Sequence, residues 1–151
     1  VRLVAQVDLS HARFDACSIA LGSAFAGVTA VGAFMKQCGM RGTSFAGADL
    51  SAVRLENCDL SECDLSDARL DGFVAGESLF VRANLARASL RGANLIDANF
   101  SKSNLLGSDL REANLFRADV SQAFIDATTL LEDAYTQHAK VWPRRDPEAT
   151  P

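Results

Sequence analysis

The sequence predicts an all-β solenoid, and three observations lead to this fold class. First, a large apolar residue recurs at every fifth position from Phe45 to Leu130, with one exception at Ala75. Second, a small residue stands two positions before most of these large ones, and third, Asp or Asn often lies between the two. A period of five matches neither a helix, with about 3.6 residues, nor an ordinary strand, with about two. It indicates a repeat architecture, in which many units stack and share one core.

The repeated unit is explicit in Ala-Asp-Leu-Ser-Ala (48–52), Ala-Asn-Leu-Ala-Arg (83–87) and Ala-Asn-Leu-Ile-Asp (93–97). These units resemble the pentapeptide-repeat family, whose motif is A(D/N)LXX. The resemblance implies a right-handed quadrilateral β-helix, in which four units form the four sides of one coil and residues twenty apart stack. Stacked coils would lie about 4.8 Å apart, the ordinary spacing of neighbouring strands. Asn84 and Asn104 would then form a side-chain ladder, and Asn94 and Asn114 would share another side.

The large positions of the repeat are expected to fill the interior. The structural core should include Leu50, Leu70, Leu90, Leu110, Phe100 and Phe73. In the unit 73–77 the two inward positions are exchanged, because Phe73 stands at the small position and Ala75 at the large one. The exchange conserves interior volume, as close packing demands. The alternative interpretation is a simple degeneracy of the repeat.

Before Thr43 the repeat is weaker, and its frame changes by one residue between Ile19 and Phe25. We expect the β-helix to span 1–130, with 20–42 continuing the coil around a bulge or a short loop. The apolar run from Ile19 to Met35 is too short and too often interrupted by Gly for a membrane span. Because the chain begins in mid-pattern and without Met, we also expect it to be a piece of a longer protein.

The repeat becomes unrecognisable after Leu130, so we expect 131–151 to form a C-terminal cap and a polar tail. The only Tyr and the only Trp of the chain, Tyr135 and Trp142, both fall in this segment. We expect them to cover leucine side chains at the end of the core. The alternative for Trp142 is an anchor for a partner, since Trp is common at interface hot spots.

Charge is distributed unevenly along the chain, although the formal net charge is only −4. Residues 48–80 hold eight acids and two bases, a local charge of −6, whereas 81–122 hold six bases and four acids. The acids Asp59, Asp64 and Asp67 are therefore candidate partner-binding residues, because an acidic coil can orient an approaching partner. A solvated surface without a partner is the alternative.

The sequence offers no recognisable catalytic, cofactor or metal chemistry. All four cysteines fall at the small inward position, which accounts for them as small hydrophobes. Their spacing fits no zinc pattern, neither histidine has a paired nucleophile, and no nucleophile elbow is present. We therefore expect a protein that is not an enzyme and needs no cofactor. Buried free thiols favour a reducing compartment, so we expect a cytoplasmic protein.

The outward positions are where function must be encoded, because packing fixes the inward ones. Candidate partner-binding residues among them are Ile96, Phe116, Leu106 and Phe124. Ile96 and Phe116 are twenty apart at the same position of the repeat, so they should stack on one side. An apolar patch surrounded by charges suggests a protein-binding surface. Scattered exposed apolar residues are also normal in monomeric proteins.

The function predicted from these features is a non-enzymatic protein–protein interaction scaffold with an unknown partner. The segments 126–135 and 141–145 are similar to those of pentapeptide domains that end larger bacterial proteins, some encoded beside type VI secretion systems and thought to assist effector loading. The alternative within the family is a DNA mimic of the quinolone-resistance type, which binds DNA gyrase. The chain departs from that type, because only 48–80 is acidic. We expect neither direct nucleic-acid binding nor membrane insertion.

Overall fold

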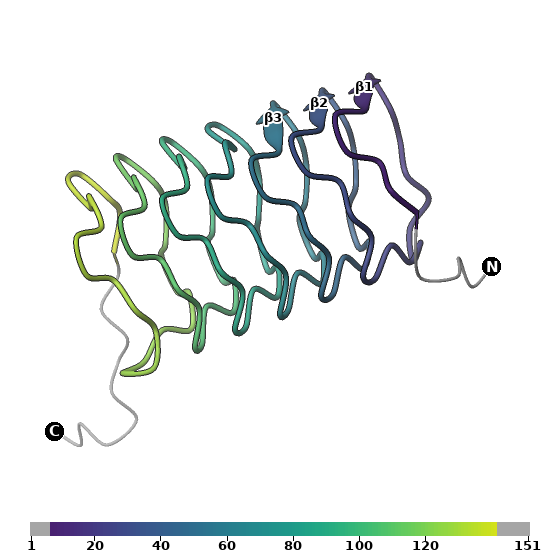
Figure 1. The fold of residues 1–151 in the computed structure, drawn as a ribbon. Helices are drawn as coiled ribbons and strands as arrows, with labels where there is room; N and C mark the ends of the chain where they lie inside the picture. The colour runs from purple at the N-terminus through teal and green to yellow at the C-terminus, as the bar shows by residue number, and fades with distance from the viewer. Residues whose placement is uncertain (1–6, 142–151) are drawn as a thin grey trace, which may run out of the picture.

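The described part of the computed structural model is residues 7–141, which wind into a right-handed quadrilateral β-helix (Figure 1). Three coils carry short parallel strands, β1 (Arg13–Asp15), β2 (Phe34–Lys36) and β3 (Arg54–Glu56), in the order β1-β2-β3. Elsewhere the coils meet through single parallel bridges between residues twenty apart, such as Asp64 with Asn84 and Asn84 with Asn104. Among residues 7–141, no helix has the length and apolarity needed to cross a bilayer.

Four sides follow one another in each coil, and the large inward residues define them. The first side contains Phe45, Leu65, Leu85 and Leu105; the second Leu50, Leu70, Leu90 and Leu110; the third Leu55, Ala75, Leu95 and Leu115; the fourth Leu60, Phe80, Phe100 and Val120. Strands β1, β2 and β3 lie on the third side. In a quadrilateral the first side lies opposite the third, so residues ten apart in sequence occupy opposite faces of the rod.

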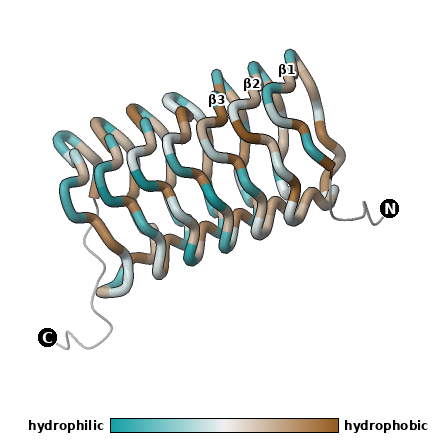
Figure 2. The backbone as a smooth tube through the Cα atoms, viewed as in Figure 1, coloured by the Kyte–Doolittle hydropathy of each residue, from teal (hydrophilic) through white to brown (hydrophobic). Residues whose placement is uncertain are grey.

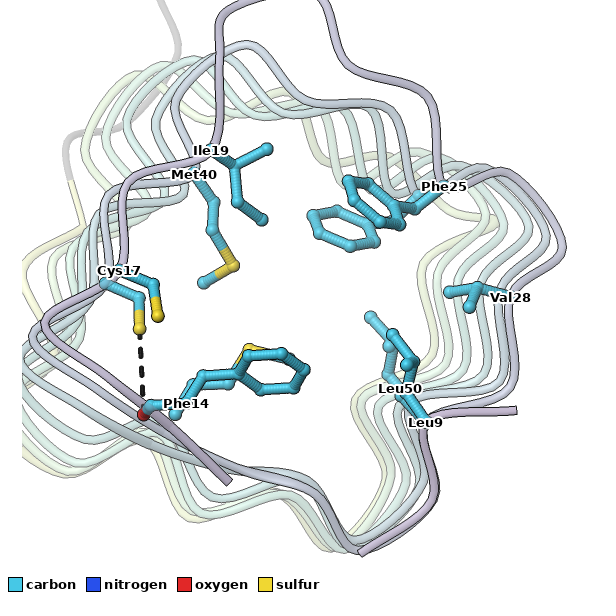
Figure 3. A pocket seen from close by; sticks show the side chains of 12 residues that line it. Leu9, Phe14, Cys17, Ile19, Phe25, Val28, Met40 and Leu50 are labelled. Carbon is cyan, nitrogen blue, oxygen red and sulfur yellow. Dashed lines mark hydrogen bonds between the residues drawn. The ribbon is translucent and has the colours of Figure 1, made fainter. Parts of the chain in front are cut away.

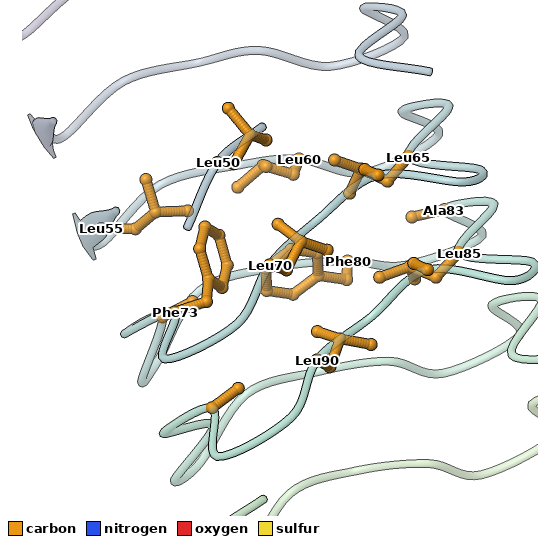
Figure 4. Close-up of a cluster of buried hydrophobic side chains, with 14 of the residues drawn as sticks. Leu50, Leu55, Leu60, Leu65, Leu70, Phe73, Phe80, Ala83, Leu85 and Leu90 are labelled. Atoms are coloured by element: carbon orange, nitrogen blue, oxygen red, sulfur yellow. The ribbon is translucent and has the colours of Figure 1, made fainter. Parts of the chain in front are cut away.

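The core runs along the axis of the rod and consists of the large and small inward residues of all four sides (Figure 4). All six predicted core residues are at most 3% exposed. The exchanged pair Phe73 and Ala75 is completely buried, and the Phe73 ring meets the Phe80 ring edge-on at 6.2 Å. Phe80 in turn stacks on Phe100 at 4.6 Å. Hydrophilic residues alternate with these hydrophobic ones around each coil (Figure 2).

The second position of the repeat favours Asp and Asn because each turn leaves one N–H group without a backbone partner. In each regular unit, three N–H groups donate to carbonyls of neighbouring coils and a fourth donates across the turn within its own coil. The remaining N–H belongs to the residue after the large one. In the unit centred on Leu65 it is Ser66 N–H, which donates to Asp64 Oδ1 at 3.1 Å. The repeat motif thus pairs every backbone donor of such a unit, as buried backbone groups require.

Left-handed backbone conformation recurs two positions after the large residue in nearly every unit, from His11 to His138. L-residues with a side chain reach this region at a cost, whereas glycine does not. At Gly42 a steric contact also favours glycine. Its φ is 66°, and an added Cβ would lie 2.4 Å from Cδ1 of Leu21.

The frame change near the N-terminus is a single inserted residue. Asp8 and Ser18 bridge residues twenty-one positions later, whereas from Ala24 to Asn104 the separation is twenty. The extra residue lies between Ile19 and Ala24, where the Leu21 side chain is 77% exposed. The expected irregularity over 20–42 is thus confined to a few residues, and 25–42 follow the regular coil.

Coil geometry continues beyond Leu130, where we expected the cap to begin. Leu130, Tyr135 and Lys140 bridge residues twenty-one positions earlier, so a second inserted residue precedes Leu130. The large inward position then falls on Leu131, and Thr136 takes the next one. That polar residue and the shifted frame made the last coil unrecognisable in the sequence. Tyr135 accordingly belongs to the coil rather than to a cap, whereas Trp142 lies outside the described residues.

Two buried serines on adjacent sides provide a first prediction. The Ser103 hydroxyl has no hydrogen-bond partner among the described residues, whereas the Ser108 hydroxyl donates to the Leu105 carbonyl at 2.8 Å. Ser103→Ala should therefore stabilise the rod by about 1 kcal/mol, because it removes an unpaired buried polar group. The matched control Ser108→Ala removes a made hydrogen bond and should be neutral or destabilising. Chemical denaturation measures both, and equal changes would contradict the prediction.

Candidate protein-binding surface

The predicted partner-binding residues do not form one patch. Ile96 and Phe116 stack on the third side, as expected, but Leu106 and Phe124 lie on the opposite first side. The candidate acids are divided in the same way. Asp64 and Asp67 lie on the first side and Asp59 lies on the fourth.

Five of the eight acids in the stretch 48–80 form ion pairs, four of them with bases of neighbouring coils. Asp67 receives two hydrogen bonds from Arg87, each 2.7 Å long. Glu62 lies 2.8 Å from Arg41 and 3.5 Å from Arg82. Further ion pairs join Lys36 to Glu56 and Arg69 to Asp49 and Asp71. The local charge of the sequence is therefore partly neutralised in space, and the rod does not present a bare acidic face there.

Asp59 and Asp64 are engaged in the turns. Asp59 Oδ1 accepts the N–H of Ser61 at 2.9 Å, and Asp64 Oδ1 caps Ser66 in the same way. Asp64 also begins the expected ladder of the first side, because Asn84 Nδ2 donates to it at 3.0 Å and Asn104 Nδ2 donates to Asn84 at 3.1 Å. Both carboxylates therefore have structural partners, which accounts for them without a binding role.

Acid should weaken the ion pairs between coils, because hydrogen bonds from Arg87 and Arg117 lower the pKa values of Asp67 and Asp97. A carboxyl whose folded pKa is lowered stabilises the fold above its unfolded pKa of about 3.9, and this stabilisation is lost as the pH falls through the folded value. The melting temperature of Asp67→Asn/Asp97→Asn should thus fall below that of wild type above about pH 5, with no difference near pH 2. Thermal melts followed by circular dichroism at several pH values measure this difference in melting temperature. Parallel curves for the two proteins would contradict the assignment.

An aromatic cluster projects from the third side near the C-terminal end, formed by Phe116, Tyr135 and His138. The Phe116 ring stacks on Tyr135 at 6.0 Å and meets the His138 ring edge-on at 5.7 Å. The Arg117 guanidinium lies over the Phe116 ring, 4.8 Å from its centroid, and is held there by two hydrogen bonds to Asp97. Phe116 is half-buried in this arrangement, whereas Tyr135 remains 49% exposed.

A groove adjoins the aromatic cluster on the same side. Ile96 lies one coil before Phe116, and with Val74 it lines a hollow of about 310 Å³. Gly76, which has no side chain, lines the same hollow. An added Cβ at Gly76 would lie 3.1 Å from the Ile96 carbonyl oxygen, so no side chain fits there without movement.

We call Val74, Ile96, Phe116, Tyr135 and His138 together the third-side surface. Sequence reasoning found its Ile96 and Phe116 but missed the contribution of Tyr135 and His138. The signal that could have found them is the spacing of twenty-one residues that follows the second insertion. Among residues 7–141, no group of three or more His, Cys, Asp or Glu side chains is placed to hold a metal ion.

Solved structures similar to this chain include other solenoids. One is a trypsin-treated variant of QnrB1, a plasmid-mediated fluoroquinolone resistance protein; it is 20% identical, with 88% of this chain and 84% of that chain covered and a TM-score of 0.54. Another is HetL from the cyanobacterium Nostoc sp. strain PCC 7120, a pentapeptide repeat protein involved in heterocyst differentiation regulation; it is 21% identical, with 89% and 86% covered and a TM-score of 0.40. At 20% identity, the likeness to the QnrB1 variant shows the fold alone.

No curated protein sequence matches this chain. The family description "Pentapeptide repeats" does match, with eight copies, in overlapping stretches that run from residue 22 to residue 130. This match covers more than half of the chain and agrees with the coil geometry. The chain therefore belongs to the pentapeptide-repeat family.

Proposed function

We propose that this protein is a non-enzymatic scaffold that binds a protein partner through the third-side surface. The observation that carries the proposal is the aromatic cluster, in which Tyr135 stays half exposed while it stacks on Phe116. An outward aromatic pair is not needed by the repeat, whose second position more often holds Asp or Asn. Aromatic and Arg side chains dominate the binding energy of protein interfaces.

The rigidity of the surface supports the same proposal. Arg117 is fixed over Phe116 by its two hydrogen bonds to Asp97, so the cluster loses little side-chain entropy when a partner binds. The groove beside Ile96 offers room for an apolar side chain of that partner. Support for a non-enzymatic role comes from the acids, many of which cap turns or pair with bases of neighbouring coils.

A matched pair of variants tests the surface. Tyr135 and Phe124 are aromatic residues at the same position of the repeat, with exposed fractions of 49% and 47%, on opposite sides of the rod. In quantitative pull-downs from the source organism, Tyr135→Ala should lower recovery of the specific partner at least about tenfold, the loss expected for a hot-spot residue. Phe124→Ala should leave the recovery unchanged.

Thermal melts of both variants must first show that the fold is kept. Equal recovery of every captured protein by wild type and both variants would refute the third-side surface. Equal loss with both variants would point to a nonspecific effect of removing an aromatic residue and would also refute it.

The gyrase-binding DNA mimic is the less well supported alternative, because five of the eight acids of 48–80 pair with Lys or Arg side chains. A supercoiling assay with purified DNA gyrase tests it directly. Inhibition at protein concentrations near that of the enzyme, or protection from a quinolone, would favour the DNA mimic over the scaffold.

Two finer parts of the proposal rest on the sequence. Effector loading for type VI secretion rests on the segments 126–135 and 141–145, the second of which lies mostly outside the described residues. Identification of the protein recovered in the pull-downs tests the assignment to effector loading. A cytoplasmic location rests on the four cysteines, all free among the described residues, since disulfides rarely persist in that compartment unless they are transient.

A further inference from the structure

Three cysteines form a column on the fourth side. Cys17, Cys38 and Cys58 occupy the same inward position in three successive coils, and the parallel bridges Ser18–Gly39 and Gly39–Asp59 fix their register. Neighbouring coils lie about 4.8 Å apart, and Cα atoms at about 4.4–6.8 Å can be joined by a disulfide.

The first two thiols of the column are oriented alike. Cys17 Sγ donates to the Asp15 carbonyl at 3.4 Å, and Cys38 Sγ donates to the Lys36 carbonyl at 3.3 Å. Asp15 and Lys36 are register partners at the ends of β1 and β2, so the two sulfur atoms stand one above the other. Cys38 Sγ also lies 3.8 Å from the Phe14 carbonyl oxygen of the preceding coil and thus faces the coil that carries Cys17.

Access distinguishes Cys17 from the other three thiols, because Cys38, Cys58 and Cys63 are all at most 3% exposed. Cys17 is only half-buried and, with Cys38, lines an apolar cavity of about 140 Å³ at the N-terminal end of the described core (Figure 3). Phe14 and Ile19, which border the same cavity, are also incompletely buried. Within the described residues, a small neutral molecule can therefore reach this part of the column. Cys58 and Cys63 are at most 2% exposed and lie deeper in the rod.

We propose that Cys17 and Cys38 form a peroxide-sensitive thiol pair that closes to a disulfide between the first two described coils. Hydrogen peroxide oxidises the Cys17 sulfur to a sulfenic acid. In this step the O–O bond of the peroxide breaks and one water is released. The Cys38 sulfur then attacks the sulfenic sulfur, the S–O bond breaks, and the second water leaves with the Cys38 proton. In total, two thiols and one peroxide give one disulfide and two waters.

The order of these steps follows from the environments of the thiols. Burial raises the pKa of the Cys38 thiol, which keeps it protonated and makes it a poor first target. Burial also raises the pKa of Cys63, to about 11, and this thiol lies outside the column of Cys17, Cys38 and Cys58. The disulfide would join the half-buried first described coil to the coil that packs against it and so restrict the opening of the first one.

Peptide mapping of the intact, reduced protein tests the proposal. After brief exposure to hydrogen peroxide, remaining thiols are alkylated in denaturant, and trypsin cleaves after Arg13, Lys36 and Arg41. Cys17 and Cys38 then fall in different peptides, whereas Cys58 and Cys63 share a third. We expect a linked pair of the Cys17 and Cys38 peptides that dithiothreitol separates, and alkylated Cys58 and Cys63.

Variants and a second readout make the test decisive. Cys63→Ser should leave the linkage intact, whereas Cys17→Ser should abolish it and leave Cys38 alkylated. Under native conditions, cleavage after Arg13 should slow at least about tenfold in the oxidised protein and not in oxidised Cys17→Ser. Accumulation of sulfinic acid at Cys17 without linkage, a Cys38–Cys58 linkage, or disulfides between molecules in dilute solution would each overturn the proposal.

Discussion

Phe73→Ala is expected to destabilise the rod by about 3–5 kcal/mol, the range for a fully buried aromatic residue. Phe73 is completely buried, and its ring lies edge-on to Phe80, which itself stacks on Phe100. Neighbouring coils are held by many backbone hydrogen bonds, so they cannot collapse into the cavity left behind. The melting temperature should fall by on the order of 10 °C.

The double variant Phe73→Ala/Ala75→Leu should recover most of this loss. It restores the ordinary arrangement of the repeat, with a small residue followed by a large one, and places the new leucine side chain between Leu55 and Leu95 of the third side. Volume-conserving changes of this kind cost less than about 1.5 kcal/mol. Ala75→Leu alone should overpack the core and cost about 1–3 kcal/mol.

Chemical denaturation of wild type, both single variants and the double variant gives a complete thermodynamic cycle. A large favourable coupling between the two sites shows that the exchange conserves interior volume. If the stability losses of Phe73→Ala and Ala75→Leu simply add in the double variant, the two residues do not compensate each other and the unit 73–77 is a degenerate repeat.

Asp64→Ala is expected to cost about 2–3 kcal/mol, because one carboxylate oxygen serves three donors. Asp64 Oδ1 accepts from Ser66 N at 3.1 Å, from Ser66 Oγ at 2.7 Å and from Asn84 Nδ2 at 3.0 Å. Removing this carboxylate leaves the Ser66 N–H group without its acceptor, and no backbone carbonyl replaces it. The Ser66 amide should also exchange with solvent faster than its neighbours.

Asp64→Asn is the matched control for this prediction. An asparagine keeps the acceptor oxygen, and Asn84 and Asn104 already cap the equivalent turns of the next two coils. This variant should lose less than about 1 kcal/mol. Equal losses for Asp64→Ala and Asp64→Asn, measured by denaturation, would show that charge rather than turn capping accounts for the aspartate.

The sequence by itself was sufficient for the fold. A period of five is a local property that every unit repeats, so errors in single units do not accumulate. The position of each residue within its unit then determines whether it faces inward, caps a turn or takes the left-handed conformation. The burial of Cys58 and Leu70 and the turn-capping by Asp64 therefore follow from one rule, the position of each residue within its unit.

Only the tertiary structure decided which outward residues meet. A single inserted residue before Leu130 shifts the frame, and the sequence then conceals that Tyr135 and His138 join Phe116 on the third side. The direction of a long side chain is equally invisible in the sequence, so the pairing of Asp67 with Arg87 could not be read from the charge of the stretch. The aromatic cluster and the pairing of Asp67 with Arg87 depend on contacts between residues of different coils, which are distant in sequence and close in space. The repeat, in contrast, depends on residues that are neighbours along the chain.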